Sequence, residues 1–402
     1  MLGSSDDAPS RPRLLRKIRA GIIGTGFAAS CHVDALLRVG VELGVVAGSS
    51  REKAESFAAA KGIARACGDP LYLIDDDSIE VVHNCTPNHL HAEINKAGLD
   101  SGKHVLSEKP LGMNSEETAS LVHAAAQSDV VSGVCFIYRH YPLVRQVKSL
   151  IDGGDVGVPH LVHGNYLQDW LLRETDWNWR LDSGKGGASR AVADIGSHWL
   201  DLVQYVTGDH VVEVFAELGT LHARRLRPEG GRHTFAANGE PHGAMTEVDT
   251  EDSGAALLRF ASGARGVFHV SQVSAGHKNR LFFEIDAAQG SLAWDQEQPN
   301  RLWMGRRDDA NSELLRDPAL LSDEAAPLAH LPGGHTEGWH DALKNLFSDF
   351  YAAVAAHQRS ESYAGDFATF SDAHRVMLEV EAIVKSHRGG LWTKVDEAEV
   401  QE

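Results

Sequence analysis

Short apolar runs alternate with segments of helical period along the first 153 residues of the chain. An aliphatic run bounded by turn signals predicts a buried strand, whereas apolar positions repeating every three or four residues predict an amphipathic helix. Strands are expected at 18–23, 41–47, 81–85, 104–106 and 130–136, and helices at 28–39, 51–61, 89–101 and from an N-cap at Ser115. Strands that alternate with helices in this way predict a parallel sheet with helices on both faces.

The pattern changes after residue 154, where apolar and polar positions alternate within several segments. Such alternation is typical of strands that bury one face, as in antiparallel sheets. Strands are expected at 161–166, 211–221, 252–260, 264–274 and 281–287, a glycine-rich loop at 226–250, and helices only at 339–356 and 369–386. This half predicts an α/β domain with an open, mainly antiparallel sheet.

The length of 402 residues exceeds what one hydrophobic core usually supports, so we expect two domains in an α/β fold. The first is placed at 17–153 and the second at 154–390. Residues 1–16 lack the apolar core of a signal peptide and are predicted to form a flexible tail. Residues 391–402 are predicted to form a C-terminal tail.

The net charge, the apolar runs and the cysteine and histidine content limit which partners, which cellular compartment and which metal sites we expect. The net charge of −18 argues against a nucleic-acid partner, because no basic surplus exists to neutralise a phosphate backbone. No apolar run approaches the roughly 18 residues that a membrane span needs, so no membrane partner is expected. The four cysteines form no C-x-x-C pair, which predicts free thiols in a reducing cytoplasm. The 22 histidines form no H-E-x-x-H motif, and we expect no metal site.

A glycine-rich turn follows the first predicted strand and precedes the first predicted helix. It reads Gly24-Thr25-Gly26-Phe27-Ala28. The first glycine permits a tight turn, and the second lets the backbone approach a pyrophosphate at the N-terminus of the helix. In this context the motif predicts a binding site for a dinucleotide.

The end of the second predicted strand bears on the choice between NAD and NADP. A carboxylate there would bind the adenosine ribose of NAD, but the chain has Gly48-Ser49-Ser50-Arg51. Small hydroxyl side chains followed by an arginine suit a 2′-phosphate, which favours NADP slightly. The alternative is that Arg51 merely begins a solvated helix, and NAD stays open.

Three side chains with catalytic potential stand in two further signatures. Lys109 follows a short apolar strand and precedes a proline, in Glu108-Lys109-Pro110. Asp194 and His198 are four residues apart, a spacing that brings both onto one face of a helix. A lysine, a carboxylate and an imidazole in one cleft can move a proton while a cofactor accepts a hydride.

Together these signatures resemble the glucose–fructose oxidoreductase, inositol dehydrogenase and rhizopine catabolism family (Gfo/Idh/MocA), from about residue 17 to 390. The motifs that carry the resemblance are the glycine turn, Thr86-Pro87-Asn88-His89-Leu90-His91, Glu108-Lys109-Pro110 and residues 187–201. The resemblance implies an N-terminal Rossmann domain, a C-terminal α/β domain, and homo-oligomers, dimers or tetramers, formed through the C-terminal sheet.

The resemblance also implies roles for single residues. Lys109 would lie beside the nicotinamide, with Glu108 near it, and Asp194 and His198 would form the substrate-side pair. Further residues implied to line the cofactor are Thr86, Pro87, Asn88 and His91.

A second cluster predicts a sugar site. The stretch 165–170 with Arg180 is similar to the levoglucosan and glucoside 3-dehydrogenase branch of the family. Aromatic faces stack on the C–H patches of a sugar, and polar groups bind its hydroxyls; a tryptophan-rich core corner is the alternative. The candidate substrate-binding residues are Tyr138, Arg139, Tyr166, Gln168, Asp169, Trp170, Arg180 and His335, of which His335 is equally well explained as a loop histidine.

The predicted function is NAD(P)-dependent oxidation of a secondary alcohol of a sugar, glycoside or polyol, with C3 one candidate position. His198 would accept the hydroxyl proton and Lys109 would stabilise the alkoxide, although these two roles are interchangeable at this stage. Asp194 would hold a substrate hydroxyl or orient His198. The alternatives are an NAD-dependent glycosidase that oxidises its sugar transiently and a non-catalytic dinucleotide-binding regulator.

Overall fold

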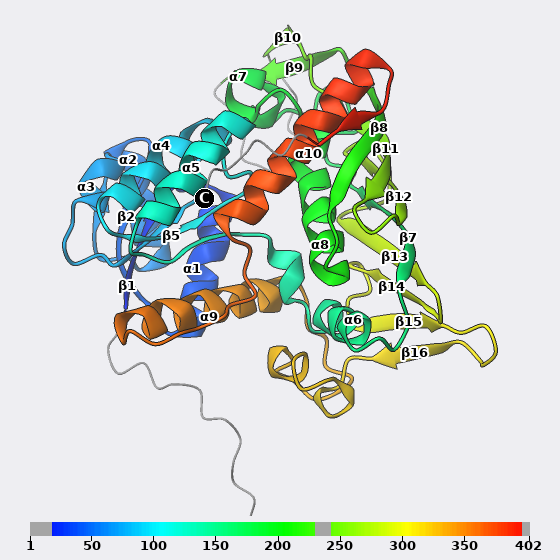
Figure 1. Ribbon diagram of the computed structural model, residues 1–402. Helices are drawn as coiled ribbons and strands as arrows, with labels where there is room; N and C mark the ends of the chain where they lie inside the picture. Colours follow the sequence, from blue (N-terminus) through cyan, green and yellow to red (C-terminus); the bar gives the residue numbers. More distant parts are fainter. Residues whose placement is uncertain (1–17, 230–242, 396–402) are drawn as a thin grey trace, which may run out of the picture.

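The computed structural model describes residues 18–229 and 243–395, and its two large sheets are a parallel one in the N-terminal half and a mixed one in the C-terminal half (Figure 1). The predicted tail at 1–16 and the residues 396–402 lie outside the described residues, as does the middle of the predicted loop at 226–250. Within the described ranges, the structure contains no helix both long and apolar enough to cross a membrane.

The N-terminal sheet has six parallel strands in the order β3-β2-β1-β4-β5-β6. Its strands are β1 (Arg19–Ile23), β2 (Glu42–Ala47), β3 (Ala66–Cys67), β4 (Val81–Asn84), β5 (His104–Ser107) and β6 (Ser132–Val134). Its helices are α1 (Phe27–Val39), α2 (Arg51–Lys61), α3 (Pro70–Ile74), α4 (His91–Asp100) and α5 (Ser115–Gln127). Every residue of β4 and β5 is buried, as expected of strands covered on both faces.

Helix ends in this half follow the capping rules, with one correction to the prediction. The N-cap of α5 is Asn114, whose side chain accepts a hydrogen bond from the Glu117 backbone N–H at 2.9 Å. Ser115, which we expected at this position, is the first helical residue. Both residue types cap well, so the sequence alone did not separate them.

The C-terminal sheet has nine strands in the order β16-β15-β14-β13-β7-β12-β11-β8-β17. Its strands are β7 (Pro159–Leu167), β8 (Val211–Gly219), β11 (Ser253–Phe260), β12 (Arg265–Ser271), β13 (Arg280–Ala287), β14 (Ser291–Asp295), β15 (Arg301–Gly305), β16 (Ser312–Leu315) and β17 (Thr393–Lys394). All neighbouring pairs are antiparallel except β7 with β12. The predicted α/β fold with a mainly antiparallel second sheet is confirmed.

At two places the structure contains strands that the pattern of polar and apolar residues did not predict. The ends of the expected loop at 226–250 form a two-stranded antiparallel sheet of β9 (Arg224–Pro228) and β10 (Gly243–Glu247). The expected C-terminal tail contributes β17, which pairs with β8. Both segments are short and polar, so their pairing depends on neighbouring strands rather than on their own hydrophobicity.

The helices expected at 339–356 and 369–386 are α9 (Trp339–Gln358) and α10 (Phe370–Gly389). Three further α-helices that were not predicted follow β6, namely α6 (Pro142–Asp152), α7 (Ser183–Gly186) and α8 (Ser197–Thr207). Helices α6, α8 and α10 lie along one face of the nine-stranded sheet, whereas α9 packs against α1 of the N-terminal half (Figure 1).

Helix α8 is fixed to the sheet by Trp199. Its indole stacks on Phe268 of β12 with ring centroids 4.8 Å apart, and its Nε1 donates to the Phe282 carbonyl oxygen at 3.0 Å. Gly164 of β7 lies beneath this indole, where an added Cβ would overlap the backbone of β13. This close packing sets the position of His198, the preceding residue.

Candidate active site

A cleft of about 980 Å³ lies between the carboxyl ends of the parallel strands and the C-terminal half. In an open parallel sheet this edge is where ligands bind, because the loops that follow the strands converge there. One wall is the glycine turn after β1, and the other includes Lys109, Asp194 and His198.

The glycine turn has the geometry that a pyrophosphate needs. Gly24 has φ of 120°, and a Cβ at this position would overlap the Cys85 carbonyl oxygen. Gly26 is the N-cap of α1 and borders open space, so no side chain caps the first backbone N–H groups of the helix. Those N–H groups and the positive end of the helix dipole fit the negative charge of a dinucleotide. Thr25, Phe27 and Ala28 line the same wall of the cleft.

The segment after β2 reaches the cleft only in part. Ser49 lines it, whereas Ser50 is the N-cap of α2 and accepts from the Lys53 backbone N–H at 3.3 Å. Arg51 forms a 2.8 Å ion pair with Glu55 on the surface. The guanidinium that we expected to meet a 2′-phosphate is therefore already paired in this structure.

The segment after β4 lines the cleft and is held in place by hydrogen bonds to neighbouring segments. Thr86, Pro87, Asn88 and His91 all line the cleft. The two ring nitrogens of the buried His91 lie 2.5 Å from the Pro110 carbonyl oxygen and 2.8 Å from that of Thr86. Asn88 donates to the Gly186 carbonyl oxygen at 2.9 Å, which ties the cofactor side to the substrate side.

Lys109 and Asp194 meet across the cleft. The Lys109 Nζ lies 2.8 Å from Asp194 Oδ1 and also donates to the Asp194 backbone carbonyl oxygen at 2.7 Å. Arg180 Nε lies 3.2 Å from the same carboxylate oxygen. Burial alone would raise the pKa of Asp194, but Arg180 and Lys109 hold it well below its usual range. Asp194 is therefore ionised throughout the neutral range.

The helix that carries Asp194 and His198 is not a uniform α-helix. Residues Val192–Gly196 form a π-helical turn that runs directly into α8. The wider turn lets the Asp194 backbone carbonyl oxygen face Lys109, a use of π-turns seen at functional sites. Among the described hydrogen bonds of Asp194 there is none to His198, so its expected role in orienting that imidazole is not supported.

His198 lies in an aromatic enclosure at the end of the cleft. The rings of Tyr138 and Phe136 meet it edge-on at 5.0 and 5.6 Å, and Tyr166 is tilted at 6.2 Å. Burial and the nearby Lys109 ammonium lower the pKa of His198 well below its usual value. Its Nδ1 is buried and has no hydrogen-bond partner among the described residues, which leaves Nε2 to face the cleft. A neutral imidazole in this position is a proton acceptor.

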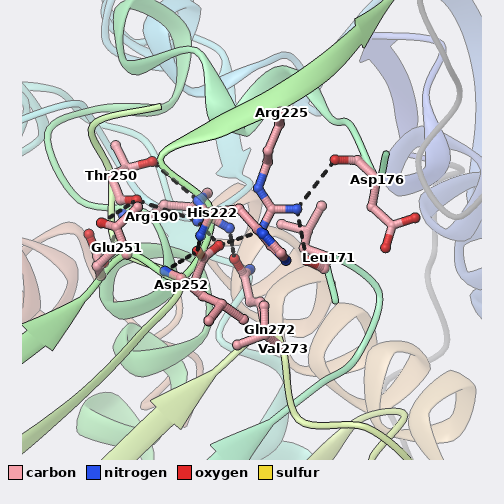
Figure 2. Close-up of polar contacts among 12 residues, drawn as sticks. Leu171, Asp176, Arg190, His222, Arg225, Thr250, Glu251, Asp252, Gln272 and Val273 are labelled. Atoms are coloured by element: carbon pink, nitrogen blue, oxygen red, sulfur yellow. Dashed lines mark hydrogen bonds and ion pairs between the residues drawn. The ribbon is translucent and has the colours of Figure 1, made fainter. Parts of the chain in front are cut away.

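A buried network of charges, in which Arg190, Arg225 and Asp252 meet (Figure 2), is connected to Asp194 through Gln272. Gln272 donates to Asp194 Oδ2 at 2.9 Å and accepts from Arg190 Nη1 at 2.9 Å. Arg190 also pairs with Asp252, which Arg225 contacts at 2.6 Å. The side chains of both arginines and of Asp252 are fully buried, so each depends on the others for its charge partner.

The same network holds the loop on the substrate side of the cleft. Arg225 Nη1 donates to the carbonyl oxygens of Leu171 and Arg173 at 2.8 and 2.9 Å (Figure 2). This loop follows β7 and begins with Gln168 and Trp170, which line the cleft. The position of Asp194 and that of the loop after β7 are thus linked through Asp252.

The substrate side contains most of the predicted sugar-binding groups. Tyr138 and Tyr166 share a hydrogen bond of 2.6 Å, and Asn279 Oδ1 accepts from Tyr166 at 2.7 Å and from Gln168 at 2.8 Å. The Trp170 indole donates to Gln168 Oε1 at 2.8 Å. Arg180 also lines this region and stacks its guanidinium on Trp179 at 4.4 Å.

Three expected substrate residues do not line the cleft. Arg139 points to the opposite side of its segment and pairs with the buried Asp201, its Nε lying 2.9 Å from the carboxylate. Asp169 pairs with Lys278 at 2.6 Å. His335 is exposed, and its carbonyl oxygen accepts from Arg316. Arg139 and Asp169 were included because they adjoin Tyr138 and Gln168 in sequence, whereas His335 fits the alternative of a loop histidine.

Sequence reasoning missed Gln272, Lys278 and Asn279. They lie at the end of β12 and before β13, where the pairing with β7 brings them beside Gln168. The signal available in the sequence was that polar residues stand at the ends of these strands. Assigning them to the site requires the register in which β7, β12 and β13 pair, which a single sequence does not give.

Both halves of the chain are similar to known protein families. Residues 18–136 match the family described as "Oxidoreductase family, NAD-binding Rossmann fold", and residues 144–293 match the "GFO/IDH/MocA C-terminal domain". The chain is 30% identical to levoglucosan dehydrogenase of Pseudarthrobacter phenanthrenivorans over 95% of this chain and 99% of that protein.

Solved structures agree with these matches. Levoglucosan dehydrogenase in complex with NADH and levoglucosan superposes with a TM-score of 0.85 at 28% identity, covering 95% of this chain and all of that one. An inositol dehydrogenase homologue from Azotobacter vinelandii, in complex with NAD+, superposes with a TM-score of 0.81 at 25% identity, covering 95% and 98%.

Proposed function

The chain belongs to the Gfo/Idh/MocA family of oxidoreductases, and on that premise we propose that it oxidises a secondary alcohol of a sugar, glycoside or polyol. The observation that carries the proposal is the meeting of Lys109, Asp194 and His198 at the end of a cleft whose other end is the glycine turn. A regulator that only bound a dinucleotide would not need these three groups together.

Each of the three groups has a defined task in the proposed reaction. The bound dinucleotide supplies the hydride acceptor. His198, neutral in its aromatic enclosure, accepts the hydroxyl proton at Nε2. Lys109 offers its ammonium to the oxygen as negative charge develops there. Asp194 fixes that ammonium through two contacts, one from its carboxylate and one from its backbone carbonyl oxygen.

The substrate class follows from the opposite wall of the cleft. Trp170 and Trp179 offer aromatic faces, while Gln168, Arg180 and Asn279 offer hydrogen bonds to hydroxyl groups. The relative that aligns over nearly the whole chain is a levoglucosan dehydrogenase. We therefore propose an anhydrosugar or glycoside as substrate, with oxidation at C3.

The proposed cofactor is NAD, with NADP tolerated. Two structural neighbours contain NADH or NAD+, and the Rossmann-domain match is described as NAD-binding. The segment after β2 has no carboxylate to repel a 2′-phosphate, since Ser49 lines the cleft there. The pairing of Arg51 with Glu55 removes the main reason to prefer NADP.

We also propose a homo-oligomer formed through the uncovered face of the nine-stranded sheet, in the cytoplasm. Large apolar side chains are exposed on five strands of this sheet, β8, β11, β12, β15 and β16: Val212, Leu257, Val267, Trp303 and Leu315. Apolar groups gathered on one sheet face are typical of an interface between copies. The four buried free cysteines fit a reducing compartment.

The proposed reaction is tested by a screen of sugars, glycosides and polyols with NAD and with NADP, monitored by absorbance of the reduced cofactor. Nuclear magnetic resonance of the product identifies the oxidised carbon. Turnover without accumulation of reduced cofactor, with release of an aglycone, would favour a glycosidase acting by transient oxidation. Dinucleotide binding without turnover of any compound would favour a regulator.

A further inference from the structure

A chain of hydrogen bonds runs from the cleft into the core through four side chains of separate elements. Glu108, which follows β5, lies 3.1 Å from His32 Nε2 of α1. His32 Nδ1 lies 2.9 Å from His83 Nδ1 of β4. His83 Nε2 lies 2.8 Å from the Tyr351 hydroxyl of α9. None of these contacts has a place in the proton transfer proposed above.

When both imidazoles are neutral, all hydrogen bonds in this series donate in the same direction. Burial lowers the pKa of His83 far below its usual value, so its ring carries one proton. The ionised Glu108 can only accept, which requires His32 to donate from Nε2 and to accept at Nδ1. His83 then donates from Nδ1, and Tyr351 donates to His83 Nε2. Every donor in the chain points toward Glu108.

The two imidazoles are held rigidly. His32 and His83 are both fully buried, and Phe347 of α9 packs against both rings at 4.8 and 5.0 Å. The Tyr351 ring stacks on His83 at 5.9 Å. A side chain confined in this way cannot turn to another partner at low cost, because the core is close-packed.

The chain ends at a charged group on the cleft wall. Glu108 lines the cleft directly before Lys109, at the end where His198 and Asp194 lie. Burial alone would raise the pKa of Glu108, but the His32 hydrogen bond and the Lys109 ammonium lower it to about 2. The redox-active ring of the cofactor must reach this end for the three catalytic groups to act on a substrate.

We propose that His32, positioned by His83 and Tyr351, keeps Glu108 ionised, and that this carboxylate stabilises the oxidised nicotinamide relative to the reduced one. The inference rests on the proposed function. The oxidised ring has a positive charge that the reduced ring lacks, so a fixed negative charge near it favours the oxidised form. Glu108 is thus a binding group, and His32, His83 and Tyr351 are positioning residues.

Several other titratable groups face Glu108 and must be counted. They are Lys109, His91, His198, Cys31, Cys85 and Cys135. Burial and the Glu108 charge raise the pKa of the three thiols, which stay neutral. Cys135 Sγ lies 3.6 Å from His32 Nε2, further than Glu108 does. The Lys109 side chain is engaged by Asp194, so the hydrogen bonds that hold the Glu108 carboxylate come from His32 Nε2 at Oε1 and from the Lys109 backbone N–H at Oε2, 3.2 Å away.

The test is the ratio of dissociation constants for NAD+ and NADH. Kd for NADH is measured by its own fluorescence, and Kd for NAD+ by quenching of the tryptophans in the cleft wall. Glu108→Gln removes the charge and keeps the shape, so the ratio Kd(NAD+)/Kd(NADH) should rise by about 10-fold or more at every pH. His32→Phe should raise the ratio more at low pH than at high pH, because a buried carboxylate that loses this donor has a higher pKa.

A matched control is His104→Phe. His104 is a buried histidine of the same sheet that binds the Val131 backbone N–H at 2.9 Å and has no contact with Glu108. This variant should leave the ratio unchanged. Equal changes of both Kd values in Glu108→Gln, or a ratio within about twofold of wild type, would overturn the inference. Wild-type protein that binds neither NAD+ nor NADH would instead refute the proposed function.

Discussion

Lys109 and Asp194 lie 2.8 Å apart although 85 positions separate them in the chain, and their contact joins the two sheets at the cleft. Lys109 follows the parallel sheet, and Asp194 belongs to the π-turn before α8. The pair presents one ammonium, fixed in direction, at the place where a substrate oxygen would bind.

Removing the side chain of Lys109 or of His198 should abolish most of the turnover. We expect Lys109→Ala and His198→Ala each to lower kcat by about 100-fold, the usual contribution of a positioned acid–base group. Cofactor affinity, measured by NADH fluorescence, should persist. Lys96→Ala, which removes an exposed lysine paired with Asp100, is the control and should keep full activity. Near wild-type turnover in either variant would remove that residue from the mechanism.

The acid limb of the pH profile should report His198. Burial lowers the pKa of His198, so the imidazole stays neutral and competent as the pH falls through 6.5. We expect kcat/KM to decline only below about pH 6.5, the ordinary value for histidine. The decline should be absent from the residual activity of His198→Ala. An acid limb centred above pH 6.5 would contradict the assignment.

Cofactor choice should respond to a carboxylate after β2. Ser49 lines the cleft there, whereas a Cβ at Gly48 would lie 3.0 Å from the Ala54 backbone nitrogen. Ser49→Asp should reduce the kcat/KM with NADP relative to that with NAD by about 10-fold or more, through repulsion of the 2′-phosphate. Ser49→Asn is the uncharged control. An unchanged preference would show that the 2′-position lies elsewhere.

Trp170 should matter for catalysis more than for folding. Its indole lines the cleft and donates to Gln168, so Trp170→Ala removes an aromatic wall of the sugar site. We expect kcat/KM for the sugar to fall about 10-fold, with a small change in Tm. Trp392, which packs on Phe215 away from the cleft, provides the control variant Trp392→Ala. A large loss of Tm with unchanged kinetics would assign Trp170 to the core.

The buried network behind Asp194 should dominate stability in the C-terminal half. Among the residues that the structure describes, Arg190→Met leaves Asp252 with Arg225 alone as a charged partner, and it removes the donor to Gln272. We expect the free energy of unfolding to fall by about 3 kcal/mol, the lower range for breaking a buried ion pair. Denaturant unfolding measures it. Lys96→Met, in an exposed pair, should cost less than about 1 kcal/mol.

The sequence predicted the two sheets and the family because these depend on local patterns. Fully apolar strands with intervening helices, and then alternating strands, are read from neighbouring residues. The resemblance to the Gfo/Idh/MocA family is confirmed, since its motifs are short and contiguous. The α/β class is confirmed for the same reason.

The parts of the site that could not be predicted depend on direction and register. Tyr138 and Arg139 are adjacent, yet one lines the cleft and the other pairs with Asp201. Asp194 and His198 both line the cleft, but their spacing gave no sign of the π-turn that directs the Asp194 carbonyl oxygen to Lys109. Asn279 joins the site only because β7 and β13 pair in one register.

Helix α9 has a consequence for any attempt to recombine this protein with its relatives. It belongs to the last part of the chain, yet it packs on α1 (Figure 1). Asp341 of α9 pairs with Arg38 of α1 at 2.6 Å. The parallel sheet is also continued by a bridge from Val134 to Ala368. A chimera that exchanges the N-terminal module by a single cut near residue 153 would combine α1 of one protein with α9 of the other, and the contacts between these two helices would not match. A working crossover design has to transplant residues 339–370 together with the N-terminal module.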